Sequence, residues 1–589
     1  MPNASDFNRF TVNPLNIDIN RSMFDMEHSV KWSANVGECI PFDCIEILPG
    51  DTVKIDTSKV IRLQPLVAPI FDEVILDVYW FFCPNRLVWS HWKEFMGENN
   101  NSAWTPSVEY NIPKLTPPQD PSNDSSYAKC WNVGTIADYM GVPVGHYTRS
   151  PSTALATEVY ANSEISALPF RAYALICDQW FRSEAVMDPV HVHVDDTNRV
   201  GVNTGDQVTD IELGGKPFIA CKFFDYFTSA LPSPQRGDPV SISVASGQTQ
   251  NVPLKFGRED ISPYRTGASV TEPGMHIGFN TDANRTIRDS SANFALAHSG
   301  TSQYVKVGSS TSPSEDTHLF INNAYVTLPD TASYITINDL RTAFAIQRYL
   351  EKQARFGGRY IEYIKGFFGV DSPDARLQRT EYLGGSRVSL NISQVENQTN
   401  TSSNTTPIGS VAGMSVTADQ HSDVDKSFTE HGYLIGIAVA RYHHSYQDSL
   451  HKMFTRFDPY EFYNPTFANL GEQKVMKNQL HAYHSVDSGT DSTFGYQEAW
   501  AEYRYMPDRV CGELRSVYET PLDMWHLGDH YSSTPSLSPE WLREDKSNLD
   551  RCLAVTSDVS NQYIADFYIE MKMTRVMPMY SIPGLIDHH

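Results

Sequence analysis

Histidine and acidic residues occur close together in the stretch HVHVDD. In an extended strand alternate side chains share a face, so His191, His193 and Asp195 would point the same way. Two histidines at that spacing can bind a metal ion, as in the cupin enzymes, whose fold is a jelly roll. The cupin pattern continues with a glutamate, however, and the positions where it would stand hold Asp196 and Thr197. Two interpretations therefore stay open, a metal site and an ordinary strand or loop.

The other motifs that carry catalytic chemistry are missing from the sequence. Histidines also cluster at 441–451 and 481–484, but neither stretch brings a third ligand at a metal-binding spacing. The chain has no GxSxG, no P-loop, no GxGxxG and no HExxH. Its eight cysteines contain no CxxC pair, which argues against a zinc ribbon or a disulfide scaffold. We therefore predict no cofactor, no metal and no catalytic residue.

A glycine-punctuated stretch, residues 354–387, is mildly basic within an acidic chain. The formal charge of the chain is -24, whereas six basic and four acidic residues give this stretch a balance of +2. An acidic surface repels phosphates, so the chain could bind nucleic acid only through a local patch. The basic residues are Arg355, Arg359, Lys365, Arg376, Arg379 and Arg387, and the acidic ones are Glu362, Asp371, Asp374 and Glu381.

Three interpretations of this stretch are open. It can be a solvated segment with local ion pairs, a subunit contact, or a patch that faces the phosphates of a nucleic acid. We favour the subunit contact, because arginine and carboxylate groups form bidentate pairs across interfaces. The interface candidates are Asp374, Arg376, Arg379, Glu381 and Arg387. The candidates for facing nucleic acid are Arg355, Arg359 and Lys365, with Phe356, Tyr360, Tyr363 and Phe367 available to stack on bases.

Strands predominate among the elements that must position these residues. Apolar and alternating runs, bounded by turn residues, predict strands at both ends of the chain. Few helices are expected: one over 168–186, and one that begins near Thr336 and stops at Gly357-Gly358. A further helix is expected over 359–368, and Gly384-Gly385 is read as a stop. The predicted strands cover 36–51, 52–65, 74–82, 431–445, 494–507 and 563–578.

Strands at both ends with helices and loops between them predict an all-β fold, with an eight-stranded antiparallel jelly roll as the natural candidate. Residues 1–24 are polar and predict an extended arm. Residues 25–237 would begin the jelly roll, and residues 334–589 would hold a helical insertion, the remaining strands and a C-terminal arm. Residues 238–333, dense in Ser, Thr, Gly, Asn and Asp, predict a variable surface insertion. No signal peptide or membrane span is expected.

Seven blocks of the sequence resemble the major capsid protein of gokushoviruses, which are small tailless phages of the Microviridae. Among them are IDINRSMFDMEHSVKWSANVGECIPFDCIEILPGD, LPFRAYALICDQWFRSEAV, ARFGGRYIEYIKGFFGVDSPDARLQRTEYLGG and MYSIPGLIDH. The blocks follow the order of the family from about residue 16 to the last residue, and the departures lie in 238–333 and 391–422. A carbohydrate-binding or adhesin module and a cupin-like metal enzyme are the alternatives, and neither explains the ordered blocks.

The resemblance implies a shell protein without enzymatic activity. It implies a viral jelly roll with long insertions, of which about sixty copies form a T=1 icosahedral shell around a circular single-stranded DNA genome. It also implies three kinds of partner: a minor spike or pilot protein, a small basic DNA-binding protein and a host receptor. The insertion 238–333 would form protrusions at the three-fold axes for host attachment. The protein would assemble in the bacterial cytoplasm and end in the virion.

Overall fold

The structure of the chain is a computed structural model that divides into two compact units. One unit joins Met1–Pro239 to Arg348–His589, and the other is Val240–Gln347. The residues that the structure describes are 21–98, 110–118, 130–144, 163–237, 337–356, 365–367, 378–398, 408–482 and 493–580, with four short strands between 251 and 327.

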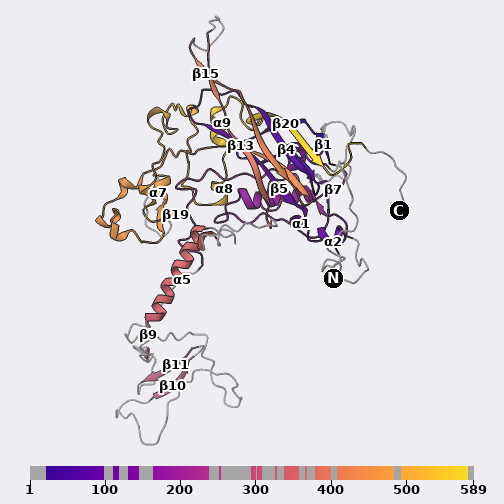
Figure 1. The fold of residues 1–589 in the computed structure, drawn as a ribbon. Helices are drawn as coiled ribbons and strands as arrows, with labels where there is room; N and C mark the ends of the chain where they lie inside the picture. Colours follow the sequence, from indigo (N-terminus) through magenta and orange to yellow (C-terminus); the bar gives the residue numbers. More distant parts are fainter. Residues whose placement is uncertain are drawn as a thin grey trace. The chain divides into compact units, whose positions relative to one another are not determined.

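Two antiparallel sheets form the centre of the larger unit (Figure 1). The first sheet has the order β1-β20-β4-β16, and β2 also pairs with β20. The second sheet has the order β13-β5-β17-β3. Their bounds are β1 Ser22–Asp25, β2 His28–Ala34, β3 Ile40–Ile47, β4 Thr52–Leu63, β5 Val74–Pro84, β13 Glu381–Ser389, β16 Thr417–Ser427, β17 Gly432–Tyr442 and β20 Tyr563–Arg575.

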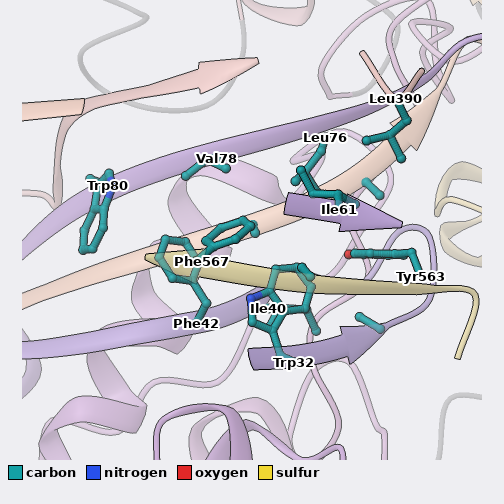
Figure 2. Packing of buried hydrophobic residues seen from close by; sticks show 14 of the residues in the cluster. Trp32, Ile40, Phe42, Ile61, Leu76, Val78, Trp80, Leu390, Tyr563 and Phe567 are labelled. Atoms are coloured by element: carbon teal, nitrogen blue, oxygen red, sulfur yellow. The ribbon is translucent and has the colours of Figure 1, made fainter. Parts of the chain in front are cut away.

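A large apolar core fills the space between the two sheets (Figure 2). Its centre is aromatic: the Phe42 ring lies edge-on to Trp80 at 5.3 Å and to Phe567 at 5.0 Å. Trp32 of β2 lies edge-on to Phe567 at 5.4 Å and to Tyr563 at 5.5 Å. Edge-on aromatic pairs stabilise a core beyond the area they bury. The rings come from β2, β3, β5 and β20, so this packing joins segments from both ends of the chain.

A second apolar cluster covers the other face of the β5 and β17 strands. In β5, Trp80 and Phe82 face the core between the sheets, whereas Phe81 and Cys83 face the second cluster. Helix α4, Leu168–Ile176, and the π-helical turn Cys177–Phe181 contribute much of this second layer. Burial on both faces explains why β5 reads as a continuous apolar run rather than as an alternating strand.

The remaining elements are short, apart from helix α5, Ile337–Phe356. The strands of the smaller unit pair only with one another among the described residues: β9 with β12, and β10 with β11. The others are α1 Asn85–Val88, α2 Trp92–Phe95, β6 Lys114–Thr116, α3 Ile136–Tyr139, β7 Ile165–Ser166, β8 Arg199–Val200, β9 Asn251–Pro253, β10 Phe294–Ser299, β11 Ser302–Val307, β12 Tyr325–Thr327, β14 Ile392–Glu396, β15 Val411–Ser415, β18 Gln473–Met476, α7 Lys477–Leu480, β19 Thr493–Gln497, α8 Pro539–Leu542 and α9 Ser547–Cys552.

Antiparallel sheets with few helices confirm the predicted all-β class, and five of the six predicted strands match β3, β4, β5, β17 and β20. The sixth is wrong beyond Gln497, because the chain turns there and Trp500 takes a positive φ of 64°. The indole N–H of Trp500 donates to the Phe467 carbonyl oxygen at 3.0 Å, and this contact overrides the strand pattern. Helix α5 ends at Phe356 as predicted, whereas most of 359–368 lies outside the described residues.

Two further differences concern the predicted ends of elements. Gly384 and Gly385 do not stop an element but lie inside β13, where the register shifts. A Cβ on Gly385 would lie 1.9 Å from the Val78 carbonyl oxygen, so only glycine fits so close to β5. Strand β1 begins at Ser22, inside the predicted N-terminal arm, while residues 1–20 lie outside the described part of the chain.

Candidate assembly surface around strand β13

Strand β13 carries two of the predicted interface residues, and both form ion pairs within the chain. Glu381 binds Lys426 of β16. The Arg387 guanidinium binds Asp77 of β5 with two hydrogen bonds, Nε to Oδ1 at 2.5 Å and Nη2 to Oδ2 at 3.0 Å. A bidentate arginine–carboxylate pair is present here, but its carboxylate belongs to the same chain and not to a neighbouring subunit. The Arg387 side chain is still 57% exposed, so one side of it faces solvent.

Asp77 is the centre of a small buried polar network. A second guanidinium, that of Arg441 on β17, donates to Asp77 Oδ2 at 2.7 Å, and the Tyr79 hydroxyl donates to the same oxygen at 2.9 Å. Burial, opposed by the nearby Arg441 charge, raises the pKa of Tyr79 to about 12, so it remains a donor at neutral pH. The hydrogen bond to Asp77 raises the pKa of Arg387. Two cations and a hydroxyl thus compensate a carboxylate buried within the sheet.

An aromatic side chain extends this network toward the surface. The guanidinium of Arg441 lies 4.2 Å from the centre of the Phe223 ring, and that of Arg387 lies 5.2 Å from it. His443 stacks on Phe223 with ring centres 4.7 Å apart. Cations over an aromatic face are attracted by the ring quadrupole. Sequence reasoning missed Asp77, Arg441 and Phe223, because they are far from Arg387 along the chain.

Arg379 lies beside the π-helical turn that follows α4. Its guanidinium lies 5.5 Å from the centre of the Trp180 ring, and the Trp180 indole N–H donates to the Thr380 hydroxyl at 2.9 Å. The Gln179 side-chain oxygen accepts from the Thr380 backbone N–H at 3.0 Å. The segment just before β13 is thus fixed to the helical layer. The Trp180 side chain is 39% exposed, although it belongs to the layer that covers β5.

A cavity of about 430 Å³ opens next to these residues. Its lining combines cationic and aromatic side chains, and Glu184 is the one carboxylate among the described lining residues. Arg355, a candidate for facing nucleic acid, lies at its rim and pairs with Glu472 at 2.5 Å and Glu498 at 3.4 Å. The lining residues with charge or aromatic rings are Trp180, Phe181, Arg182, Glu184, Lys222, Phe223, Phe224, Arg355 and Arg441.

The other predicted residues are only partly covered by the structure. Lys365 is exposed on a helical turn, residues 365–367. Asp374, Arg376 and Arg359 lie outside the described residues. Of the eight candidate residues, the structure therefore places Arg379, Glu381 and Arg387 on or just before β13, each with a different partner, and Arg355 on α5 at the cavity.

The HVHVDD stretch is a loop, which is one of the two interpretations left open for it, and its side chains are engaged in different directions. His193 binds the carboxylate of Glu212 through Nδ1, and its backbone N–H donates to the same carboxylate at 2.8 Å. Asp195 pairs instead with Arg199 at 3.3 Å and Arg171 at 3.5 Å. Among the described residues no three His, Cys, Asp or Glu side chains gather closely enough to hold a metal ion.

One histidine of the stretch 441–451 is buried in a charged network that the sequence did not indicate. His444 lies between two carboxylates, with Nδ1 2.8 Å from Asp529 and Nε2 2.7 Å from Glu544. Burial disfavours the charged ring, but Asp529 and Glu544 outweigh it and raise the pKa of His444 to about 9. Lys222 also pairs with Asp529, at 3.2 Å. The pairing of charges in this network is typical of a structural site.

Comparison with known proteins distinguishes the capsid protein from the two alternatives, an adhesin module and a cupin-like enzyme. The profile of a family described as "Capsid protein (F protein)" matches residues 15–585. The chain belongs to this capsid protein family. It is a structural protein and not an enzyme, and the resemblance stated from the sequence blocks is confirmed.

Three relatives of this capsid protein come from small phages of different bacteria. The capsid protein VP1 of Spiroplasma virus 4 is 36% identical, over 98% of this chain and 97% of the relative. The capsid protein VP1 of Chlamydia phage 1 is 34% identical, over 98% of each chain. The capsid protein VP1 of Bdellovibrio phage phiMH2K is 34% identical, over 96% of this chain and 95% of the relative. In the described part of the chain, none of the helices is both long and apolar enough to span a bilayer.

Proposed function

We propose that the protein forms a T=1 icosahedral shell of about sixty copies around a circular single-stranded DNA genome. The observation that carries this proposal is the family match over nearly the whole chain, with relatives covered from end to end. A shared capsid fold of equal length supports a shared mode of assembly. Assembly would take place in the host cytoplasm.

We also propose that the two sheets are the halves of a viral jelly roll. The strands β2, β3, β4, β5, β13, β16, β17 and β20 can be numbered one to eight in chain order. One sheet then has the order one, eight, three, six, and the other has the order two, seven, four, five. A chain folded as two Greek keys places its eight strands in this order. The pairing order supports the proposal, and β1 is an additional short strand that pairs with the C-terminal end of β20.

The charged residues around β13 have proposed roles within the shell. The exposed sides of Arg379 and Arg387, with Asp374, Arg376 and Glu381, are proposed to contact a neighbouring subunit. The cavity lined by Arg355 and Arg441 supports the alternative role, a local contact with DNA through cations and stacking rings. Arg359 and Lys365 are also proposed to contact DNA.

The smaller unit and the companion proteins complete the proposed virion. Residues 238–333 are proposed to form the surface protrusions that attach to a host receptor. The described strands of the smaller unit pair only with one another, which supports a separate protruding unit. A minor spike or pilot protein and a small basic DNA-binding protein are the other proposed partners. The basic partner would neutralise the genome, since the shell protein carries a formal charge of -24.

The proposal is tested by nuclease protection of purified particles. We expect particles that contain this chain to protect circular single-stranded DNA from nuclease until the shell is opened with denaturant. Electron microscopy of the same sample should show closed spherical shells. Particles that protect no DNA in the presence of the companion proteins would contradict the proposed enclosure of a genome.

A further inference from the structure

One segment of the larger unit has a defined backbone but little buried surface, although its Arg456 side chain is only 5% exposed. Residues 452–470 form three short 3₁₀ helices, Lys452–Thr455, Pro459–Glu461 and Pro465–Phe467, and each residue of the segment is exposed or only partly buried. The segment belongs to the orange part of the chain that precedes α7 in Figure 1. We call this segment together with Tyr503 the aromatic face.

The aromatic face is unusually apolar for a surface. Phe457 is 89% exposed and Tyr460 is 74% exposed, although large aromatic side chains are normally buried. The exposed large apolar side chains of the face are Met453, Phe454, Phe457, Tyr460, Phe462, Tyr463, Leu470 and Tyr503. Together they expose on the order of 900 Å², taking about 200 Å² for each fully exposed side chain. Exposed apolar surface that gathers on one segment marks an interaction site more often than single exposed residues do.

The charged groups of the face already have partners within the same chain. Lys452 and Arg456 both bind Glu502, at 3.2 Å and 2.9 Å. Asp458 and Glu461 form a capping box, in which each carboxylate accepts backbone N–H groups of the same turn. Covering the face would therefore leave none of these charges without a hydrogen-bond or ion-pair partner, which lowers the cost of burying them.

Contacts among the rings hold the face in one arrangement. The Arg456 guanidinium lies 4.2 Å from the centre of the Tyr503 ring, and the Tyr503 hydroxyl accepts from the Tyr463 backbone N–H at 3.2 Å. Tyr463 lies edge-on to Trp500 at 5.7 Å. A surface that is ordered before binding loses less conformational entropy when a partner covers it. These features together describe a preformed protein interface.

We propose that the aromatic face binds a second copy of this chain and forms a contact between subunits of the shell. The inference rests on the proposed function, which requires copies to meet. The exposed area matches the roughly 800 Å² that each partner contributes to a specific interface. Residues 452–470 hold two basic and two acidic residues, so this segment is neutral in a chain of formal charge -24. Two acidic copies repel least where their surfaces are neutral.

A triple variant tests the contact. Phe454→Gln, Phe457→Gln and Tyr460→Gln replace three exposed rings whose removal leaves no buried cavity. We expect the protomer to fold with an unchanged unfolding transition, and the yield of closed shells by sedimentation to fall at least ten-fold. A matched control, Val133→Gln with Val559→Gln, replaces exposed apolar residues outside the face and should assemble normally. A triple variant that assembles at the wild-type yield would overturn the inference.

Radical footprinting of the wild-type chain identifies what covers the face. We expect Phe457 and Tyr460 to be labelled in the free protomer and protected in the shell. Protection in the free protomer would mean that another part of the same chain covers the face, and this would overturn the inference. A wild-type chain that forms only small oligomers would contradict the proposed shell, while protection of the face in those oligomers would still support the contact. A chain that stays monomeric would contradict both.

Discussion

Asp77 shows at the scale of single residues how the chain keeps a carboxylate inside an apolar strand. Its side chain is 2% exposed, and two arginines and a tyrosine hydroxyl compensate its charge. Sequence reasoning identified Arg387 as a residue that pairs bidentately. It could not name the partner, because Asp77 lies 310 residues away and only the pairing of β13 with β5 brings the two together.

Removal of the Asp77 carboxylate is expected to destabilise the fold. Asp77→Ala leaves the guanidinium of Arg441 mostly buried without its anion, and such a change costs about 3–5 kcal/mol. The free energy of unfolding of the unassembled protomer, measured in urea, checks this. Arg387→Lys is the matched control. It alters the Asp77 pair on the side chain that is 57% exposed, and an exposed ion pair contributes about 1 kcal/mol or less. A loss below about 1 kcal/mol for Asp77→Ala would contradict the network as described.

His444 predicts how stability depends on pH. Its pKa is about 9 in the folded chain and 6.5 as a free side chain, because Asp529 and Glu544 outweigh the burial that disfavours its charge. The charged ring therefore stabilises the fold fully below pH 6.5, and this contribution is lost as the pH rises through 9. The loss is on the order of 3 kcal/mol.

The pH dependence is measured by comparing two chains. The free energy of unfolding of the wild type is expected to fall between pH 6.5 and 9 more steeply than that of His444→Gln. At pH 6 the variant should be less stable than the wild type. Its free energy of unfolding should lack the part of the decrease between pH 6.5 and 9 that comes from His444. Parallel curves for the two chains would show that His444 does not titrate in this range.

At the scale of elements, the strands were predictable and their irregularities were not. Apolar runs and turn residues predicted β3, β4, β5, β17 and β20, because the local pattern of apolar residues indicates a strand. The turn at Trp500 and the passage of β13 through two glycines depend on neighbours that are distant in the sequence. Nothing in the residues 452–470 alone distinguished an exposed aromatic face from a buried core segment.

The glycines of β13 give a prediction at this scale. Gly385→Ala would place a Cβ 1.9 Å from the Val78 carbonyl oxygen, so β13 and β5 would have to separate. We expect a loss of about 1–3 kcal/mol in the free energy of unfolding, as for other overpacked sites. Gly471→Ala is the control, because its nearest neighbour is the flexible Glu351 carboxylate at 3.1 Å. Equal stability of both variants would refute the close approach.

At the scale of the whole molecule, the family blocks predicted more than the physical patterns did. Composition and periodicity led to an all-β chain, but the shell and its genome came from the resemblance. The interface residues could not be chosen from the sequence, because an arginine looks the same whether its carboxylate lies in its own chain or in a neighbour. Arg387 and Glu381 have partners within the chain. The exposed sides of their side chains are the parts that are proposed to contact a neighbouring subunit.

Deletion of the insertion tests the division of the chain. Replacing 240–332 with a flexible linker should leave the unfolding transition of the larger unit unchanged, since its sheets include no described strand from the smaller unit. Circular dichroism and thermal unfolding measure the fold, and microscopy of assembled particles should show that surface protrusions are missing. Loss of the folded core would contradict this boundary.

The mass of native particles tests the central claim most directly. About sixty chains of 66.3 kDa give a shell of roughly 4 MDa before DNA, which sedimentation or mass photometry resolves from smaller oligomers. The account predicts a single closed species of that mass when the chain is produced with its companion proteins. A discrete species of one to three chains under the same conditions would contradict it.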